Sequence, residues 1–276
     1  MEFDNLASAL TDQVYPVLAA LAICMARATG VILITPAFNR LGLTGLIRSA
    51  VAMTLSLPML LPVLDSLSSM DITGFTVAGL LLKELLIGVL IGMVFGIPFW
   101  AAEVAGEAVD LQRASTMGQL LDPMGSSESG VTSTLLVVTL VALFFATGGF
   151  NVLLDGFYRS YTLWPVDAFM PALDTRTALV MLGFLDQVMK IGILMVAPLI
   201  IAMLVTDLML AYLARMAPSL NVFILSLPIK NLLFTFLMLL YIAFLIPRMF
   251  NELGALQGHY KYFESLFDAP SSSSNR

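Results

Sequence analysis

The chain has 276 residues, of which 59% are hydrophobic and only 12% charged. A soluble domain carries about a quarter charged residues, so the composition excludes an ordinary soluble protein and indicates a surface that faces lipid or apolar partners. The net charge of −6, the scattered basic residues, the one cysteine (Cys24) and the one histidine (His259) exclude nucleic-acid binding, an internal disulfide and histidine-based sites. We therefore expect no cofactor, no metal and no nucleic-acid partner. Residues 1–4 lack the basic region of a cleavable signal, so the first apolar segment is expected to remain in the mature protein.

Six apolar segments are long enough to cross a bilayer, which takes about 20 residues. In chain order they span residues 14–34, 46–64, 75–102, 129–154, 188–213 and 220–247. Backbone in lipid must satisfy its own hydrogen bonds, so these segments are predicted to be helices. The predicted fold is an all-α integral membrane protein with about six hydrophobic helical segments, several of them kinked or hairpin-like. We expect one helical domain over residues 1–250 and a short polar tail over 251–276 with a disordered serine-rich end.

The charges in the connecting segments conflict with six crossings. By the positive-inside rule, the loop that carries Arg40 and Arg48 lies inside and the loop that carries Asp65 and Asp71 lies outside. Six crossings would then leave the basic tail outside, so either one segment is split or some apolar helices do not cross. Charges within apolar segments favour the second possibility, because charged side chains facing lipid are costly. They are Arg27, Lys83, Glu84, Asp207, Arg215 and Lys230. Taken singly they are open to local pairing or snorkelling, and taken together they suggest hairpins packed against other proteins.

The segment after the third apolar stretch has regularly spaced charges. Glu103, Glu107, Asp110 and Arg113 are four, three and three residues apart, which places them along one helical face. One interpretation is a solvated face with an Asp110–Arg113 ion pair, and the other is a face that lines an aqueous conduit. No histidine, cysteine or serine lies nearby to complete a catalytic set, so an enzyme is not expected.

Residues 112–130 are polar and rich in small side chains. Ser127 or Ser129 could cap the following helix, whereas a small-residue loop between apolar helices also suits a plug or gasket in a channel. The candidate pore and plug residues are Asp110, Gln112, Arg113, Met117, Asp122, Pro123, Gly125, Ser126, Ser127, Glu128 and Ser129.

Two prolines ten residues apart, Pro218 and Pro228, are expected to break the last apolar segment and free backbone groups for Asn221 and Lys230 to bind. The candidate assembly residues are Glu103, Glu107, Asp207, Arg215, Asn221, Phe223, Pro228 and Lys230. A secondary transporter would also have broken helices, around an ion site at mid-membrane. No matching pair of broken helices occurs in the first half of the chain, which disfavours that alternative.

The order and spacing of several short motifs resemble one family over nearly the whole chain. The motifs are residues 106–107, 110–113, 121–123, 126–129, 217–223 and 227–230. They are similar to the T subunit of type III secretion export gates (SctT, of the YscT, HrcT and SpaR types), the counterpart of flagellar FliR. The Gln112-Arg113 pair and residues 227–230 look more like the secretion branch, and a flagellar FliR-type paralogue is the alternative. Ala114 stands where the family pattern often has glycine.

The resemblance implies a non-enzymatic subunit that helps form and close the pore for unfolded secreted proteins. The implied partners are the R and S gate subunits (SctR and SctS types), the switch subunit U (SctU type) and the export gate A subunit (SctV type). It also implies contact with membrane lipid in the bacterial inner membrane, with much of the assembly raised toward the periplasm. The loop over about residues 113–130 would help plug the pore.

Overall fold

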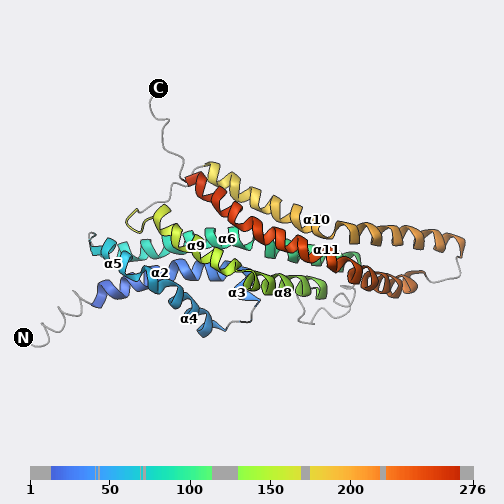
Figure 1. Cartoon of the computed structure of the whole chain (residues 1–276), viewed down its shortest axis with the longest axis horizontal. Helices are drawn as coiled ribbons and strands as arrows, with labels where there is room; N and C mark the ends of the chain where they lie inside the picture. The colour runs from blue at the N-terminus through green and yellow to red at the C-terminus, as the bar shows by residue number, and fades with distance from the viewer. Residues whose placement is uncertain are drawn as a thin grey trace, which may run out of the picture. The chain divides into compact units, whose positions relative to one another are not determined.

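The computed structural model describes residues 14–40, 42, 44–68, 70, 73–113, 130–168, 175–217 and 222–267. Within these residues the regular structure is helical, as predicted (Figure 1). The elements are α2 (Tyr15–Ile34), α3 (Pro36–Asn39), α4 (Gly45–Ser56), the 3-10 turn η2 (Leu57–Met59), α5 (Leu60–Ser68), α6 (Gly74–Gln112), α8 (Val131–Ala146), α9 (Gly149–Leu163), α10 (Thr175–Met216) and α11 (Val222–Phe267). By length and composition, five helices in the described part of the chain could cross a membrane, or six if the bent pair α8 and α9 counts as one span.

The chain divides into two compact units. The first contains residues 1–96, 148–181 and 256–276, and the second contains residues 97–147 and 182–255. The long helices α6, α10 and α11 each contribute one part to either unit.

In the first unit, α2 packs against α4 and α5, and the three lie side by side in Figure 1. Its core joins Ile23 and Cys24 of α2 to Leu67 of α5 and Leu80 of α6. A second contact of α2 depends on glycine: a Cβ added to Gly88 of α6 would lie 2.1 Å from the carbonyl oxygen of Arg27. The absence of a side chain therefore lets α2 and α6 approach at the distance of backbone contact.

In the second unit, the end of α6 packs on α8 and α10. The rings of Phe99 on α6 and Phe144 on α8 meet edge to face, with centroids 5.4 Å apart. The hydroxyl of Tyr241 on α11 donates a 2.9 Å hydrogen bond to the carbonyl oxygen of Met195 on α10. This unit therefore has an aromatic and aliphatic core, with polar ties between its long helices.

Three helices are longer than the sequence suggested. The apolar segment expected to end at residue 102 is continuous with the charged helical face expected over residues 103–113, and together they form α6 to Gln112. Helix α10 begins at Thr175, before the apolar segment expected from residue 188. The expected break at Pro228 is wrong, because α11 continues through Pro228 and Pro247. Each proline removes one backbone hydrogen bond, and a helix of 46 residues retains many others. The expected tail boundary at residue 250 falls inside α11, while residues 268–276 lie outside the described part.

Candidate functional site

Two carboxylates of α6 bind the first turn of α8. The backbone N–H of Gly130 donates to Oε1 of Glu107 at 2.8 Å. The backbone N–H of Thr132 donates to Oδ2 of Asp110 at 2.8 Å, and the Thr132 hydroxyl donates to Oδ1 at 2.7 Å. The N–H groups that open a helix have no partner within the helix and carry partial positive charge. Glu107 and Asp110 therefore cap α8 from another helix.

The local sequence makes this cap possible. Glu107 and Asp110 are three residues apart and share one face of α6. Gly106 lies beside Ser133, where an added Cβ would come 2.1 Å from the Ser133 Cα, so only glycine lets α8 come this close. The capping position itself is Gly130, which has no side chain to cap the helix. The serines expected as caps, Ser127 and Ser129, lie outside the described residues.

Arg113 completes the contacts of Asp110. Its Nη2 lies 2.7 Å from Oδ1 of Asp110, and its guanidinium lies 4.5 Å from the ring centroid of Phe234 on α11. The predicted ion pair between the two residues is confirmed. The side chain of Asp110 is fully buried, so neither a solvated face nor a face lining an aqueous conduit holds at this residue, whereas Glu103, Glu107 and Arg113 are half-buried. An aspartate enclosed in this way needs several donors to offset the loss of water.

The last residue of α6 is tied to α10 and α11. The side-chain amide of Gln112 donates to Oδ2 of Asp207 on α10 at 3.0 Å. Lys230 on α11 forms an ion pair with Oδ1 of Asp207 and donates to the backbone carbonyl of Gln112 at 3.3 Å. That carbonyl lies at the end of α6, where no further turn can satisfy it. We call these residues, with Glu107, Asp110, Arg113 and Phe234, the α6 junction.

The structure thus brings together six of the predicted site residues, and Thr132 and Phe234 join them without having been predicted. Glu103 is half-buried one turn before Glu107, Arg215 is exposed in the last turn of α10, and Pro228 lies within α11. Phe223 belongs to α11, with its side chain outside the described residues. The remaining candidates also lie outside them, namely Met117, Asp122, Pro123, Gly125, Ser126, Ser127, Glu128, Ser129 and Asn221.

A second charged cluster lies in the first unit, and it was not predicted as a site. Nε of Arg27 on α2 lies 2.5 Å from Oε2 of Glu84 on α6, and Nζ of Lys83 lies 3.1 Å from the other oxygen of Glu84. All three side chains are almost completely buried. For these residues the local-pairing alternative is confirmed, as it is for Asp207 and Lys230. The position of these charges within apolar segments was a signal in the sequence that they are special. It did not identify their partners, because Glu84 is 57 residues away from Arg27.

The two cations of this cluster bind the chain where α9 ends. Arg27 donates to the carbonyl of Trp164 at 2.9 Å, and Lys83 donates to the carbonyls of Pro165 and Val166 at 2.8 and 3.0 Å. The guanidinium of Arg27 also stacks 3.8 Å from the ring centroid of Tyr161. Carbonyl groups at a helix end carry partial negative charge and favour cations. Arg27 therefore caps the end of α9 at Trp164, with the opposite sign to the cap on α8, and Lys83 binds the two residues that follow.

Within the described ranges, no three His, Cys, Asp or Glu side chains are grouped as metal ligands would be. In both clusters the charged groups contact backbone atoms at helix ends. The geometry supports a role in holding segments of the chain in place.

Comparison with known proteins identifies the family. Residues 18–256 match the family model of bacterial export proteins, family 1. The chain is 35% identical over 233 residues to the Yop proteins translocation protein T of Yersinia pestis, covering 84% of this chain and 89% of that protein. It is 32% identical to the secretion system apparatus protein SsaT of Salmonella typhimurium, over 81% of this chain and 87% of the relative. The flagellar biosynthetic protein FliR of Bacillus subtilis is 28% identical over 54% of this chain and 58% of its own. The chain therefore belongs to the bacterial export proteins, family 1, as a type III export apparatus T subunit of the FliR family.

Proposed function

We propose that this T subunit helps form and close the pore through which a type III secretion apparatus passes unfolded proteins, and that it does so without catalysing a reaction. The observation that supports this role best is that both flanks of residues 114–129 bind one buried carboxylate. Arg113, before this segment, pairs with Asp110, and Thr132, after it, donates two hydrogen bonds to the same side chain. A plug that opens and closes needs such a base, because the chain must return to one place after each substrate has passed.

The composition of the segment suits the same role. Residues 122–130 include a proline, two glycines and three serines, which combine small volume with hydrogen-bonding capacity. We propose that Met117, Asp122, Pro123 and residues 125–129 close the pore and that the α6 junction holds the ends of this segment.

The secretion branch is the better supported reading. The named secretion relatives are 35% and 32% identical to this chain, whereas the flagellar FliR proteins of B. subtilis and Caulobacter vibrioides are 28% and 24% identical. A flagellar role is the second candidate, supported by those matches.

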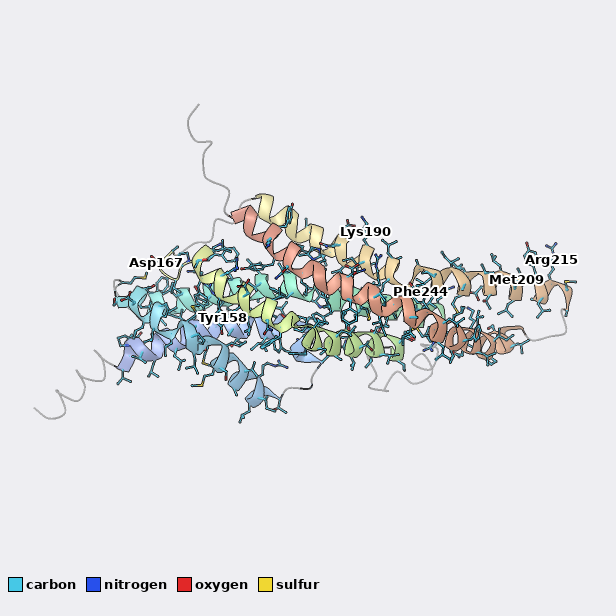
Figure 2. All side chains as sticks on the ribbon, viewed as in Figure 1. Tyr158, Asp167, Lys190, Met209, Arg215 and Phe244 are labelled. Carbon is cyan, nitrogen blue, oxygen red and sulfur yellow. The ribbon has the colours of Figure 1, made fainter. Side chains whose placement is uncertain are left out.

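The long apolar helices support a multi-pass membrane protein that is part of a larger secretion complex. We place it in the bacterial inner membrane, with much of the complex raised toward the periplasm. Large apolar side chains are exposed along α10 and α11, including Met209 at 63% and Phe244 at 72% (Figure 2). Such surfaces need lipid or protein to cover them. We propose R- and S-type gate subunits as the protein partners (SctR and SctS), with U-type and A-type subunits (SctU and SctV) binding the assembled gate. Glu103, Arg215, Asn221 and Phe223 are proposed assembly residues.

Deletion of residues 125–127 tests the plug. The complex is purified from cells that express the chain with its two partner gate subunits, and its conductance is measured in a planar bilayer. The deletion should raise the conductance of the closed gate at unchanged recovery of the complex. A matched control deletes residues 271–273, which are three serines of the tail. Equal conductance of the deletion variant and the intact protein would refute the plug role.

Native mass spectrometry of the same preparation tests the partners. One copy of this chain with several copies of two small hydrophobic proteins would support the gate assignment. A lone chain, recovered although both partners are expressed well, would reject it.

A further inference from the structure

The contacts of Gln112 suggest a role for Asp207 and Lys230 inside the chain. Assembly is the role predicted for both residues from the sequence. In the structure they bind each other and the last helical residue of α6, through both the side chain and the backbone carbonyl of Gln112. Three helices therefore meet through four polar groups, two of which belong to Gln112.

The burial of Lys230 makes the loss of its contacts with Asp207 and Gln112 costly. The side chain of Lys230 is only 13% exposed, and its ammonium group has the Asp207 carboxylate and the Gln112 carbonyl as acceptors. A largely buried ammonium that loses its carboxylate retains most of its desolvation cost. Lys230 therefore favours the arrangement in which Asp207 and the end of α6 are both in place.

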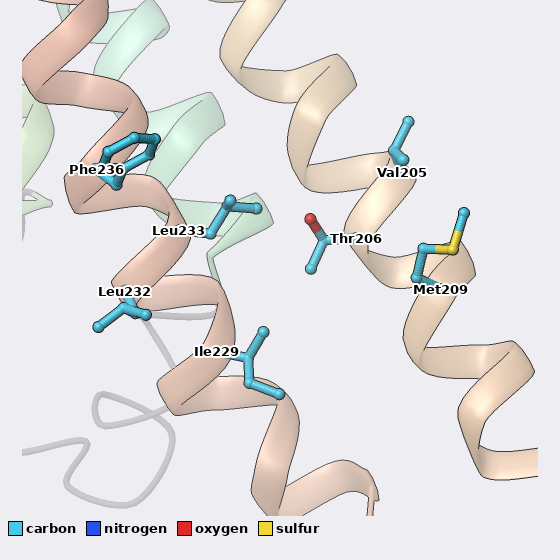
Figure 3. Close-up of a pocket in the computed structure, with 7 residues that line it drawn as sticks. All are labelled: Val205, Thr206, Met209, Ile229, Leu232, Leu233 and Phe236. Atoms are coloured by element: carbon cyan, nitrogen blue, oxygen red, sulfur yellow. The ribbon is translucent and has the colours of Figure 1, made fainter.

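The surface between α10 and α11 is hollowed at the same level. A groove of about 350 Å³ lies between these helices, lined by Val205, Thr206, Met209, Ile229, Leu232, Leu233 and Phe236 (Figure 3). These residues flank Asp207 on α10 and Lys230 on α11 in the sequence. Side chains across an open groove contribute few dispersion contacts. The ion pair therefore bridges α10 and α11 beside this groove, at the level where α6 ends.

The polar contacts at the end of α6 extend to α8. Arg113 follows Gln112 directly, and its guanidinium lies between Asp110 and the ring of Phe234 on α11. Asp110 in turn holds Thr132 of α8. A displacement of α11 from α10 would act on Gln112 through Lys230 and on Arg113 through Phe234.

We propose that Asp207 and Lys230 are positioning residues, which hold the end of α6 against α10 and α11 and thereby keep the two flanks of residues 114–129 together. Separation of this pair lets the flanks part. The consequence for the pore rests on the proposed function, whereas the position of the flanks does not.

Spin labels on the two flanks measure their separation directly. Leu111 at the end of α6 and Val131 at the start of α8 are 64% and 77% exposed, so cysteines there can carry labels. Cys24 is replaced by alanine to leave two thiols. The labelled chain is purified in complex with its partner subunits. In the parent, pulsed electron paramagnetic resonance should give one narrow distance distribution.

Three variants separate positioning from charge alone. Lys230→Met preserves length but removes the donors, and it should broaden the distribution toward longer distances. Lys230→Arg preserves donors for Asp207 and Gln112, and it should restore the narrow distribution. Lys190→Met on α10 is the matched control, because Lys190 is exposed and should leave the distances unchanged.

The outcomes distinguish this proposal from the plug. Broadening in Lys230→Met together with raised conductance supports both. Broadening without a change in conductance supports positioning and rejects the plug. A distribution as narrow as in the parent overturns the positioning role, and so does loss of the complex with the narrow distribution retained in the free chain, since that result assigns Lys230 to assembly alone.

Discussion

Asp110 of α6 accepts a 2.8 Å hydrogen bond from the backbone N–H of Thr132, so a residue near the end of one helix caps the start of the next. Thr132 follows Asp110 by 22 positions in the sequence, so residues on both sides of 114–129 meet at one carboxylate. The contribution of this junction to the stability of the chain can be measured by removing the carboxylate.

Replacement of Asp110 by alanine should lower the stability of the chain by about 3 kcal/mol or more, because it leaves Arg113 without its counter-charge and the first turn of α8 without its cap. The measurement is the unfolding midpoint in detergent. Asp155→Ala is the control: it removes an i,i+4 pair with Arg159 whose side chains are more than half exposed, and such pairs contribute less than about 1 kcal/mol. Equal effects of the two substitutions would contradict the buried role of Asp110.

Replacement of Glu84 by glutamine should be more disruptive than the combined replacement of Arg27, Lys83 and Glu84 by methionine. The single change leaves two buried cations facing a neutral amide, at a cost of about 3–5 kcal/mol, whereas the triple change removes all the charges together. Unfolding midpoints of both variants, measured in the same detergent, test this order. The reverse order would show that the hydrogen bonds from Arg27 and Lys83 to the carbonyls of Trp164, Pro165 and Val166 contribute more stability than the removal of the buried charges restores.

Gly88→Ala should separate α2 from α6, because the new Cβ would lie 2.1 Å from the Arg27 carbonyl oxygen, which is backbone and cannot rotate away. Gly254→Ala in α11 is the matched substitution, since no atom lies within 4 Å of its Cβ position. There, alanine should stabilise the helix by about 1 kcal/mol. Opposite signs of the two changes in unfolding midpoint are expected, and equal signs would reject the close contact of α2 with α6.

Tyr260→Phe should cost about 1 kcal/mol, because the hydroxyl of Tyr260 donates a buried 2.7 Å hydrogen bond to the carbonyl of Gly156 on α9. Tyr212→Phe on α10 removes a hydroxyl from a side chain that is 65% exposed and should have almost no effect. Hydrogen exchange of α9 should increase only in the first variant. Unchanged exchange there would show that the ring of Tyr260 suffices to hold α9.

The helical segments could be predicted because a bilayer sets a minimum apolar length, and that length is visible in the sequence. The Asp110–Arg113 pair was also predictable, since residues three apart are neighbours on a helix. The end of α6 agrees with the charge spacing over residues 103–113, whereas the end of α11 was not predictable, because a helix that extends past the apolar stretch leaves no signal in hydropathy. The helix break predicted at Pro228 was wrong because proline lowers helix propensity only locally, whereas the rest of α11 keeps the helix continuous.

The tertiary contacts of the charges were beyond local reasoning. Arg27 and Glu84 are 57 residues apart, and Gln112 and Asp207 are 95 apart. The spacing of such residues in the sequence does not indicate which side chains contact each other in the fold. Thr132 gave no signal in the sequence, because buried hydroxyls in apolar segments are common and most bond to their own helix.

The break between α8 and α9 affects whether the chain crosses the membrane an odd or an even number of times. Gly148, with φ of +80°, separates a helix of 16 residues from one of 15. At 1.5 Å per residue these helices are about 24 and 22 Å long, each shorter than a hydrocarbon layer of about 30 Å. A bent pair that enters and leaves on the same side adds no crossing and leaves five. Five is odd, so the start of α2 and the end of α11, which carries Arg248 and Lys261, would face opposite compartments, and the positive-inside rule places those two basic residues inside.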